Sequence, residues 1–93
     1  MTLDEAVAEL KRAGLEVSAG PDGFSAAADP HQPADVIALQ GVRFVYNFGF
    51  GASKIGPLWF FHHRGTVGRP SEEFERLEDA VARGLALFAE YRA

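Results

Sequence analysis

Residues 42–64 carry most of the sheet-forming sequence and read VRFVYNFGF (42–50), GASKIG (51–56) and PLWFFHHR (57–64). In the first run every even position from 44 to 50 is aromatic, and this period of two predicts a β-strand with its rings on one face. The last run predicts a second strand. The Gly-containing residues between the runs predict the loop of a hairpin.

The aromatic pattern also predicts how the two strands pair. Closing the loop between residues 50 and 57 gives three cross-strand pairs: Phe48 with Trp59, Tyr46 with Phe61, and Phe44 with His63. A slip of one residue would divide the rings between the two faces, so the pattern favours this register. We expect these rings to form the core. The opposite face would then show Arg43, Val45, Asn47, Leu58, Phe60 and His62.

The segments before this hairpin contain clear local signals. Thr2 and Glu5 have the spacing of a capping box, and Gly14 suits the end of a helix, so we expect a helix over 3–13. Alternating residues on either side of Gly20-Pro21-Asp22-Gly23 predict a hairpin of strands 15–19 and 23–28. Residues 34–40 favour a short helix between Pro33 and Gly41, although Val36, Ile37 and Leu39 also suit a strand.

The C-terminal segment has the pattern of a long helix. Ser71 suits an N-cap, and apolar residues recur at steps of three and four over 72–91: Phe74, Leu77, Val81, Leu85, Phe88 and Tyr91. The predicted fold class is therefore α+β, with the order α-β-β-(short α)-β-β-α. It has a four-stranded, mainly antiparallel sheet and the two main helices packed on one face.

Length and composition restrict what this chain can be. Its 93 residues, 47% hydrophobic and 24% charged, predict a single compact domain, 1–93. Without cysteine it has no disulfide or thiolate site, and we expect a cytoplasmic protein. No apolar run is long enough for a membrane span, and the acidic amphipathic N-terminus is unlike a signal peptide.

Charge is distributed unevenly along the chain. Residues 36–71 contain no Asp or Glu but include four of the nine Lys and Arg residues, whereas the rest carries the other five and all 13 acidic residues. One explanation for the missing acidic residues is that strands contain few Asp and Glu in any protein. The alternative is a surface that binds an acidic partner, and the residues assigned to it are Arg43, Val45, Lys54, Ile55, Phe60, His62, Arg64 and Arg69.

The sequence shows no pattern typical of catalysis, metal binding or a cofactor. His62 and His63 are adjacent in a predicted strand, so they point to opposite faces and do not hold one ion together. The Gly-rich residues 49–56 lack the order of a phosphate-binding loop, and no serine lies in a nucleophile motif. We expect a protein that is not an enzyme.

The N-terminal part resembles small accessory proteins of phages and mobile elements. The likeness covers residues 2–41, in TLDEAVAELKRAGLEV (2–17), the DGF turn (22–24) and ADVIALQG (34–41), and residues 42–64 depart from it. It implies a non-enzymatic protein that occupies a host protein or a protein–nucleic acid complex, for example an anti-CRISPR-like inhibitor of a defence complex.

Two alternatives to this function stay open. One is a nucleic-acid-binding module that uses the basic aromatic hairpin 42–64, because rings beside Arg and Lys are typical of single-strand binding. The other is a homodimer that buries the second sheet face against its own copy. A further candidate surface is the acidic face expected on helix 72–91, with Glu72, Glu73, Glu75 and Glu78.

Overall fold

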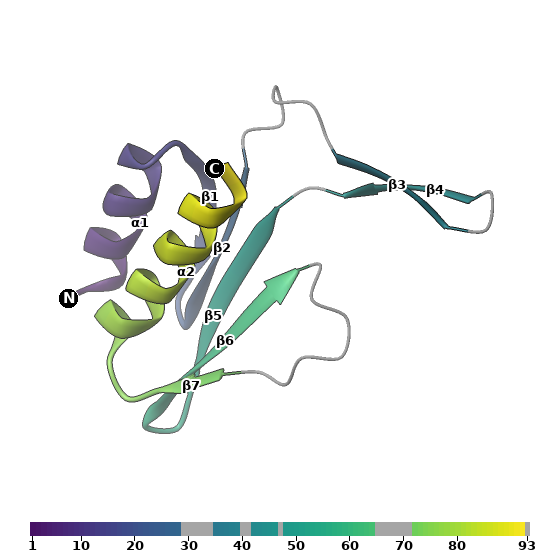
Figure 1. The fold of residues 1–93 in the computed structure, drawn as a ribbon. Coiled ribbons are helices and arrows are strands. Elements are labelled where there is room, and N and C mark those ends of the chain that lie inside the picture. The colour runs from purple at the N-terminus through teal and green to yellow at the C-terminus, as the bar shows by residue number, and fades with distance from the viewer. Residues whose placement is uncertain (29–34, 40–41, 47, 65–71, 93) are drawn as a thin grey trace.

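A computed structural model describes residues 1–28, 48–63 and 72–92, and the backbone of residues 35–39, 42–46 and 64. The elements are α1 (Leu3–Arg12), β1 (Leu15–Gly20), β2 (Gly23–Ala28), β3 (Asp35–Leu39), β4 (Val42–Tyr46), β5 (Gly49–Ile55), β6 (Leu58–Arg64), β7 (Glu72–Phe74) and α2 (Leu77–Arg92). One antiparallel sheet has the order β1-β2-β5-β6-β7, and β3 and β4 form a separate two-stranded sheet. Both helices cover the same face of the larger sheet (Figure 1). The α+β class and the helix layer are confirmed, with five strands in the main sheet where four were expected.

The N-terminal elements form as the local signals predict. The Thr2 hydroxyl accepts a hydrogen bond from the Glu5 amide at 3.2 Å, and the Glu5 carboxylate accepts one from the Thr2 amide at 3.1 Å. Gly14 follows the helix with a φ of 98°, which glycine adopts without strain. β1 then pairs with β2 from Leu15↔Ala28 to Gly20↔Gly23, so the predicted hairpin is confirmed.

The predicted single strand over 42–50 is wrong, and so is its register. β4 ends at Tyr46 and pairs with β3, whereas β5 begins at Gly49 and pairs with β6. The observed pairs include Phe50↔His63, Ala52↔Phe61 and Lys54↔Trp59. The reason is the turn: Gly56 has a φ of 61° and allows a tight reversal beside Pro57, so residues 51–55 extend the strand instead of forming a loop.

Residues 35–39 form strand β3 and not the expected short helix. β3 pairs antiparallel with β4, with Val36 opposite Val45 and Ile37 opposite Phe44. β-branched residues lose more side-chain freedom in a helix than in a strand, which is consistent with this outcome. Pro33 and Gly41, which suggested helix ends, lie outside the described residues.

The second helix begins five residues later than expected. Glu72–Phe74 is strand β7, which pairs with β6 through Trp59↔Phe74, Phe60↔Glu73 and Phe61↔Glu72, and α2 begins only at Leu77. Pairing along the edge of β6 satisfies backbone groups that the first helical turn would leave unpaired. The predicted N-cap, Ser71, lies outside the described residues.

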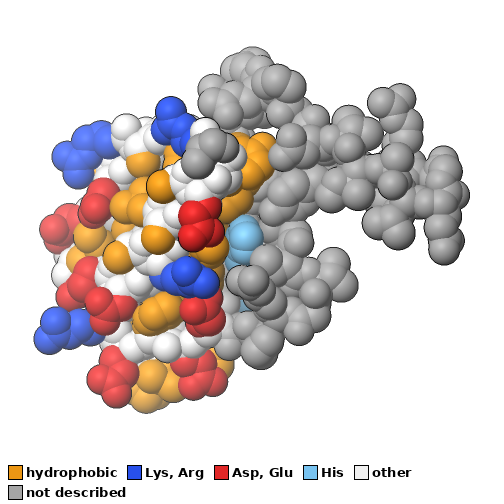
Figure 2. Space-filling view, viewed as in Figure 1, with side chains coloured by type: hydrophobic (Ala, Val, Ile, Leu, Met, Phe, Trp, Pro, Cys, Tyr) orange, Lys and Arg blue, Asp and Glu red, His pale blue; other side chains and the backbone are white. Residues whose placement is uncertain are grey.

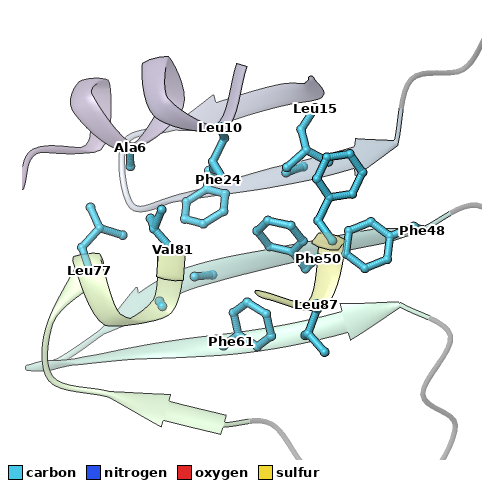
Figure 3. Close-up of a cluster of buried hydrophobic side chains, with 14 of the residues drawn as sticks. Ala6, Leu10, Leu15, Phe24, Phe48, Phe50, Phe61, Leu77, Val81 and Leu87 are labelled. Atoms are coloured by element: carbon cyan, nitrogen blue, oxygen red, sulfur yellow. The ribbon is translucent and has the colours of Figure 1, made fainter. Parts of the chain in front are cut away.

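The core lies between the two helices and the sheet (Figure 3). Phe48, Phe61, Leu10 and Val81 are its largest fully buried side chains. The rings of Phe50 and Phe61 stack with centroids 5.6 Å apart, and Phe48 stacks on Phe88 at 5.5 Å. Burial of Phe48 and Phe61 confirms part of the predicted aromatic core. Trp59 is half-buried, and Phe44 and Tyr46 belong to the β3–β4 sheet.

Candidate binding face

The face of the five-stranded sheet opposite the helices is the candidate functional surface. Side chains alternate along each strand, so the buried Phe24, Phe50 and Phe61 mark the helix side and their neighbours mark the other side. We call this second side the open face. By strand register its described members are Glu16, Ser18, Gly20, Gly23, Ser25, Ala27, Gly49, Gly51, Ser53, Ile55, Leu58, Phe60, His62 and Glu73.

Small residues form the floor of the open face on β2 and β5. Ala27 lies opposite Gly49, Ser25 opposite Gly51, and Gly23 opposite Ser53. A Cβ on Gly51 would lie 2.7 Å from the Phe24 carbonyl oxygen, so glycine lets β5 approach β2 closely here. The result is a hollow of about 350 Å³, lined on this side by Ser25, Ala27, Gly49, Gly51, Ser53 and His62.

β6 borders the hollow and contributes His62 and His63 to its lining. Leu58 and Phe60 are half-buried on the side of β6 away from α1 and α2, and His62 is exposed on the same side. Arg64 occupies the next position on the same face by register, opposite Gly49. Apolar surface next to a concave floor is typical of a contact site for another molecule.

The structure brings together only part of the predicted partner-binding patch. Phe60, His62 and Arg64 share one face of β6, and Ile55 is 63% exposed at the nearby hairpin tip. Lys54 lies on the other side of the sheet, with its ammonium 6.0 Å from the Trp59 ring centroid, because residues 51–55 continue strand β5 instead of forming the expected loop.

The remaining members of the predicted patch lie elsewhere. Arg43 and Val45 are on β4 in the two-stranded sheet, so strand pairing does not place them beside Phe60. Arg69 lies outside the described residues. The small-residue floor was not predicted, although GFSAAA (23–28) and GFGAS (49–53) both carry a small residue at every second position.

The expected acidic helix face is dispersed in the structure. Glu72 and Glu73 lie on β7 and alternate between the two sheet faces, and only Glu78 is on α2. Arg83 Nε lies 3.2 Å from Glu72 Oε1, and the N-terminal ammonium lies 3.7 Å from Glu78 Oε2. A hydrogen bond from its own backbone amide, together with the nearby ammonium, lowers the pKa of Glu78. Figure 2 shows acidic and basic side chains interspersed around the helices.

His62 and His63 lie on opposite faces of β6, as expected, and the His63 ring packs against Phe48 with centroids 5.2 Å apart. Within the described ranges, no group of three His, Cys, Asp or Glu residues is arranged to hold a metal ion. None of the described helices is both long and apolar enough to span a membrane.

Comparison with known proteins adds no relative. No family model, curated protein or solved structure matches this chain. The arguments on function therefore rest on the open face and on the residues that form it.

Proposed function

We propose that this chain is a non-enzymatic binding protein that holds a segment of another polypeptide on the open face of its sheet. The observation that carries the proposal is the hollow over Ser25, Gly49 and Gly51, with half-buried Leu58 and Phe60 beside it. A floor of glycine, alanine and serine accepts large apolar side chains from a partner, and burying them provides the binding energy.

The chemistry of this face favours protein over nucleic acid. Single-strand binding needs exposed rings next to cations, but Phe48 and Phe61 are buried in the core. Lys54 is on the helix side of the sheet, and the open face has Glu16 and Glu73 near its two edges. An acidic protein with a net charge of −4 is also repelled by phosphates.

The partner we favour is a host protein or a protein–nucleic acid complex in the cytoplasm. This follows from the resemblance of residues 2–41 to phage and mobile-element accessory proteins, and inhibition of a defence complex, as by an anti-CRISPR protein, is the form of activity it implies. The open face supports the proposal by supplying a surface on which such a partner would be held.

Site-specific cross-linking tests the proposal. A photo-reactive amino acid replaces His62 on the open face in one variant and Glu90 on α2, also exposed, in the control. Both variants are irradiated in host lysate and the cross-linked products are identified by mass spectrometry. We expect one host protein to be linked at position 62 and not at position 90. Equal products at both positions, or no product at position 62, would refute the proposal. Nucleic acid linked at position 62 would favour the alternative of a nucleic-acid-binding module.

A further inference from the structure

The β3–β4 sheet is an unusual part of this molecule. Figure 1 shows it projecting away from the five-stranded sheet, and in the described part of the chain neither strand packs against another element. We call it the ribbon. A two-stranded ribbon is barely stable by itself in water, because it has too little apolar surface to bury. A second surface is therefore needed to cover it.

The register of the ribbon divides its residues into two unlike faces. Val36, Ala38, Arg43 and Val45 share one face by alternation. The other face has Asp35 opposite Tyr46, Ile37 opposite Phe44, and Leu39 opposite Val42. This second face, the apolar face of the ribbon, thus groups five large apolar residues and a single charge.

The chemistry of the hollow on the open face suits this apolar face. Its floor is glycine, alanine and serine, so the large residues of the ribbon would meet only small side chains there. Leu58 and Phe60 lie on the same face beside the hollow, with Phe60 opposite Ser53 of the floor, and they supply apolar contact there. The positions of His62 and Arg64 on the same face also suit the lone acidic residue of the ribbon, Asp35.

The ribbon is connected in a way that prevents it from reaching the hollow of its own chain. Only Asn47 and Phe48 separate β4 from β5. Phe48 is fixed, since its side chain is 1% exposed on the helix side and its carbonyl accepts a hydrogen bond at 2.9 Å from the Ala28 amide. Folding β4 back over the open face of β5 would require reversing the chain at one residue, which is too short for a turn.

We propose that the apolar face of the ribbon lies in the open-face hollow of a second copy, and that the second copy returns the same contact. The exchange is symmetric, so it closes as a dimer. It rests on the proposed function, that the open face binds polypeptide, and it identifies the occupant of that face when no host partner is bound. A host partner then competes with the ribbon for the hollow.

Four variants test the exchange by light scattering and sedimentation at micromolar concentration. Phe44→Asp charges the apolar face of the ribbon, and Val45→Asp makes the same kind of change on its other face. Ser25→Arg fills the hollow, and Ala89→Arg places the same side chain on an exposed position of α2. Thermal unfolding confirms that each variant is folded.

We expect wild type and both controls to have twice the 10.1 kDa chain mass. Phe44→Asp and Ser25→Arg should each raise the dimer dissociation constant by about a hundredfold or more, since a charge would be buried without a partner. Mixing these two variants should restore association, because one intact ribbon then meets one intact hollow. A dimer held together by contact between two ribbons would not be restored by this mixing.

Three outcomes would overturn the exchange: a monomeric wild type, a Ser25→Arg variant that stays dimeric, or a mixture that stays monomeric. Its failure is distinguishable from failure of the proposed function. If the wild type is monomeric while position 62 still cross-links a host protein, only the exchange fails. If position 62 links only a second copy of this chain, the host partner fails and the exchange stands.

Discussion

Gly84 lies where α2 comes closest to the sheet. A Cβ built at this position would collide with the ring of Phe50, which is itself 3% exposed and edge-on to the Phe24 ring at 6.1 Å. Glycine in a helix normally costs stability, so its presence in α2 reflects this close approach. A methyl group at position 84 would therefore force α2 away from the sheet.

Gly84→Ala should therefore destabilise the protein. On an exposed helix the same change would stabilise by about 1 kcal/mol, but here we expect a loss of about 1–3 kcal/mol from overpacking. Urea unfolding at constant pH gives the value. Phe50→Leu removes ring atoms next to Gly84, so Gly84→Ala should cost less in that background. If the losses in the free energy of unfolding caused by the two substitutions simply add, residues 84 and 50 are not in contact.

Two aromatic residues, Phe48 and Trp59, should differ sharply in their contribution to stability. Phe48→Ala should cost about 3–5 kcal/mol, because Phe48 is fully buried and contacts several other rings. Trp59→Ala should cost about 1–2 kcal/mol, since Trp59 is only half-buried. Unfolding followed by circular dichroism compares them. A larger loss for Trp59→Ala would mean that the core is centred elsewhere.

Arg43 and Arg64, which the sequence placed in one patch, should separate in binding experiments. Arg64 occupies the open face by register, whereas Arg43 is on the ribbon, on the side away from its apolar face. Arg64→Glu should weaken binding of the host protein captured at position 62 by about tenfold, and Arg43→Glu should leave its affinity within about twofold. Titration of each variant with that protein measures both effects.

At the scale of elements, α1 depends on its capping box. The Thr2 amide donates to the Glu5 carboxylate, and this bond lowers the pKa of Glu5 below its ordinary value of 4.5. A lowered pKa in the folded state stabilises the fold above pH 4.5, and this contribution is lost as the pH falls through the folded-state value. The first turn of α1 should thus weaken in acid.

Thr2→Ala should cost about 1 kcal/mol at neutral pH, because the Glu5 amide loses its acceptor. Thr2→Ser retains a hydroxyl and should restore the stability. Glu5→Gln should reduce the loss of stability between pH 7 and acid, because the titrating carboxylate is absent. Urea unfolding at the two pH values tests these changes, and an unchanged pH dependence in Glu5→Gln would show that other groups account for it.

Elements with complete local signals were predicted well, and the errors have a common physical origin. The capping box and the Pro-Asp turn are satisfied within a few residues, so α1 and the β1–β2 hairpin follow from sequence. The aromatic period from Phe44 to Phe50 continues across two strands that belong to different sheets. Periodicity reports which residues share a face but contains no information about which neighbour a strand pairs with.

The same limit applies to the candidate site. Phe60 and His62 could be placed on one face because they alternate within β6. The floor contributed by Ser25 and Gly51 depends on the pairing of β2 with β5, which are separated by the whole ribbon. Such non-local pairing is chosen by the total burial of the sheet and not by any local pattern.

For the whole molecule, the ribbon is an insertion between two neighbouring strands of the main sheet. Replacing residues 35–46 with a short Gly-Ser linker should leave the five-stranded domain folded, because no described contact to another element is lost. We expect the unfolding temperature at low protein concentration to change by only a few degrees. The variant should lose any increase of that temperature with concentration. Collapse of the amide NMR spectrum would contradict this independence.

Trp59 is the only tryptophan of the chain, and it lies on the helix side of β6 near the hairpin tip. The sheet separates its indole from the open face, so intrinsic fluorescence should follow global unfolding without responding to occupancy of the hollow. Emission at one wavelength can therefore report folding even while copies associate. A second tryptophan, placed by Ser18→Trp on the open face of β1, would supply the missing signal, and the two together would separate folding from docking in a single titration.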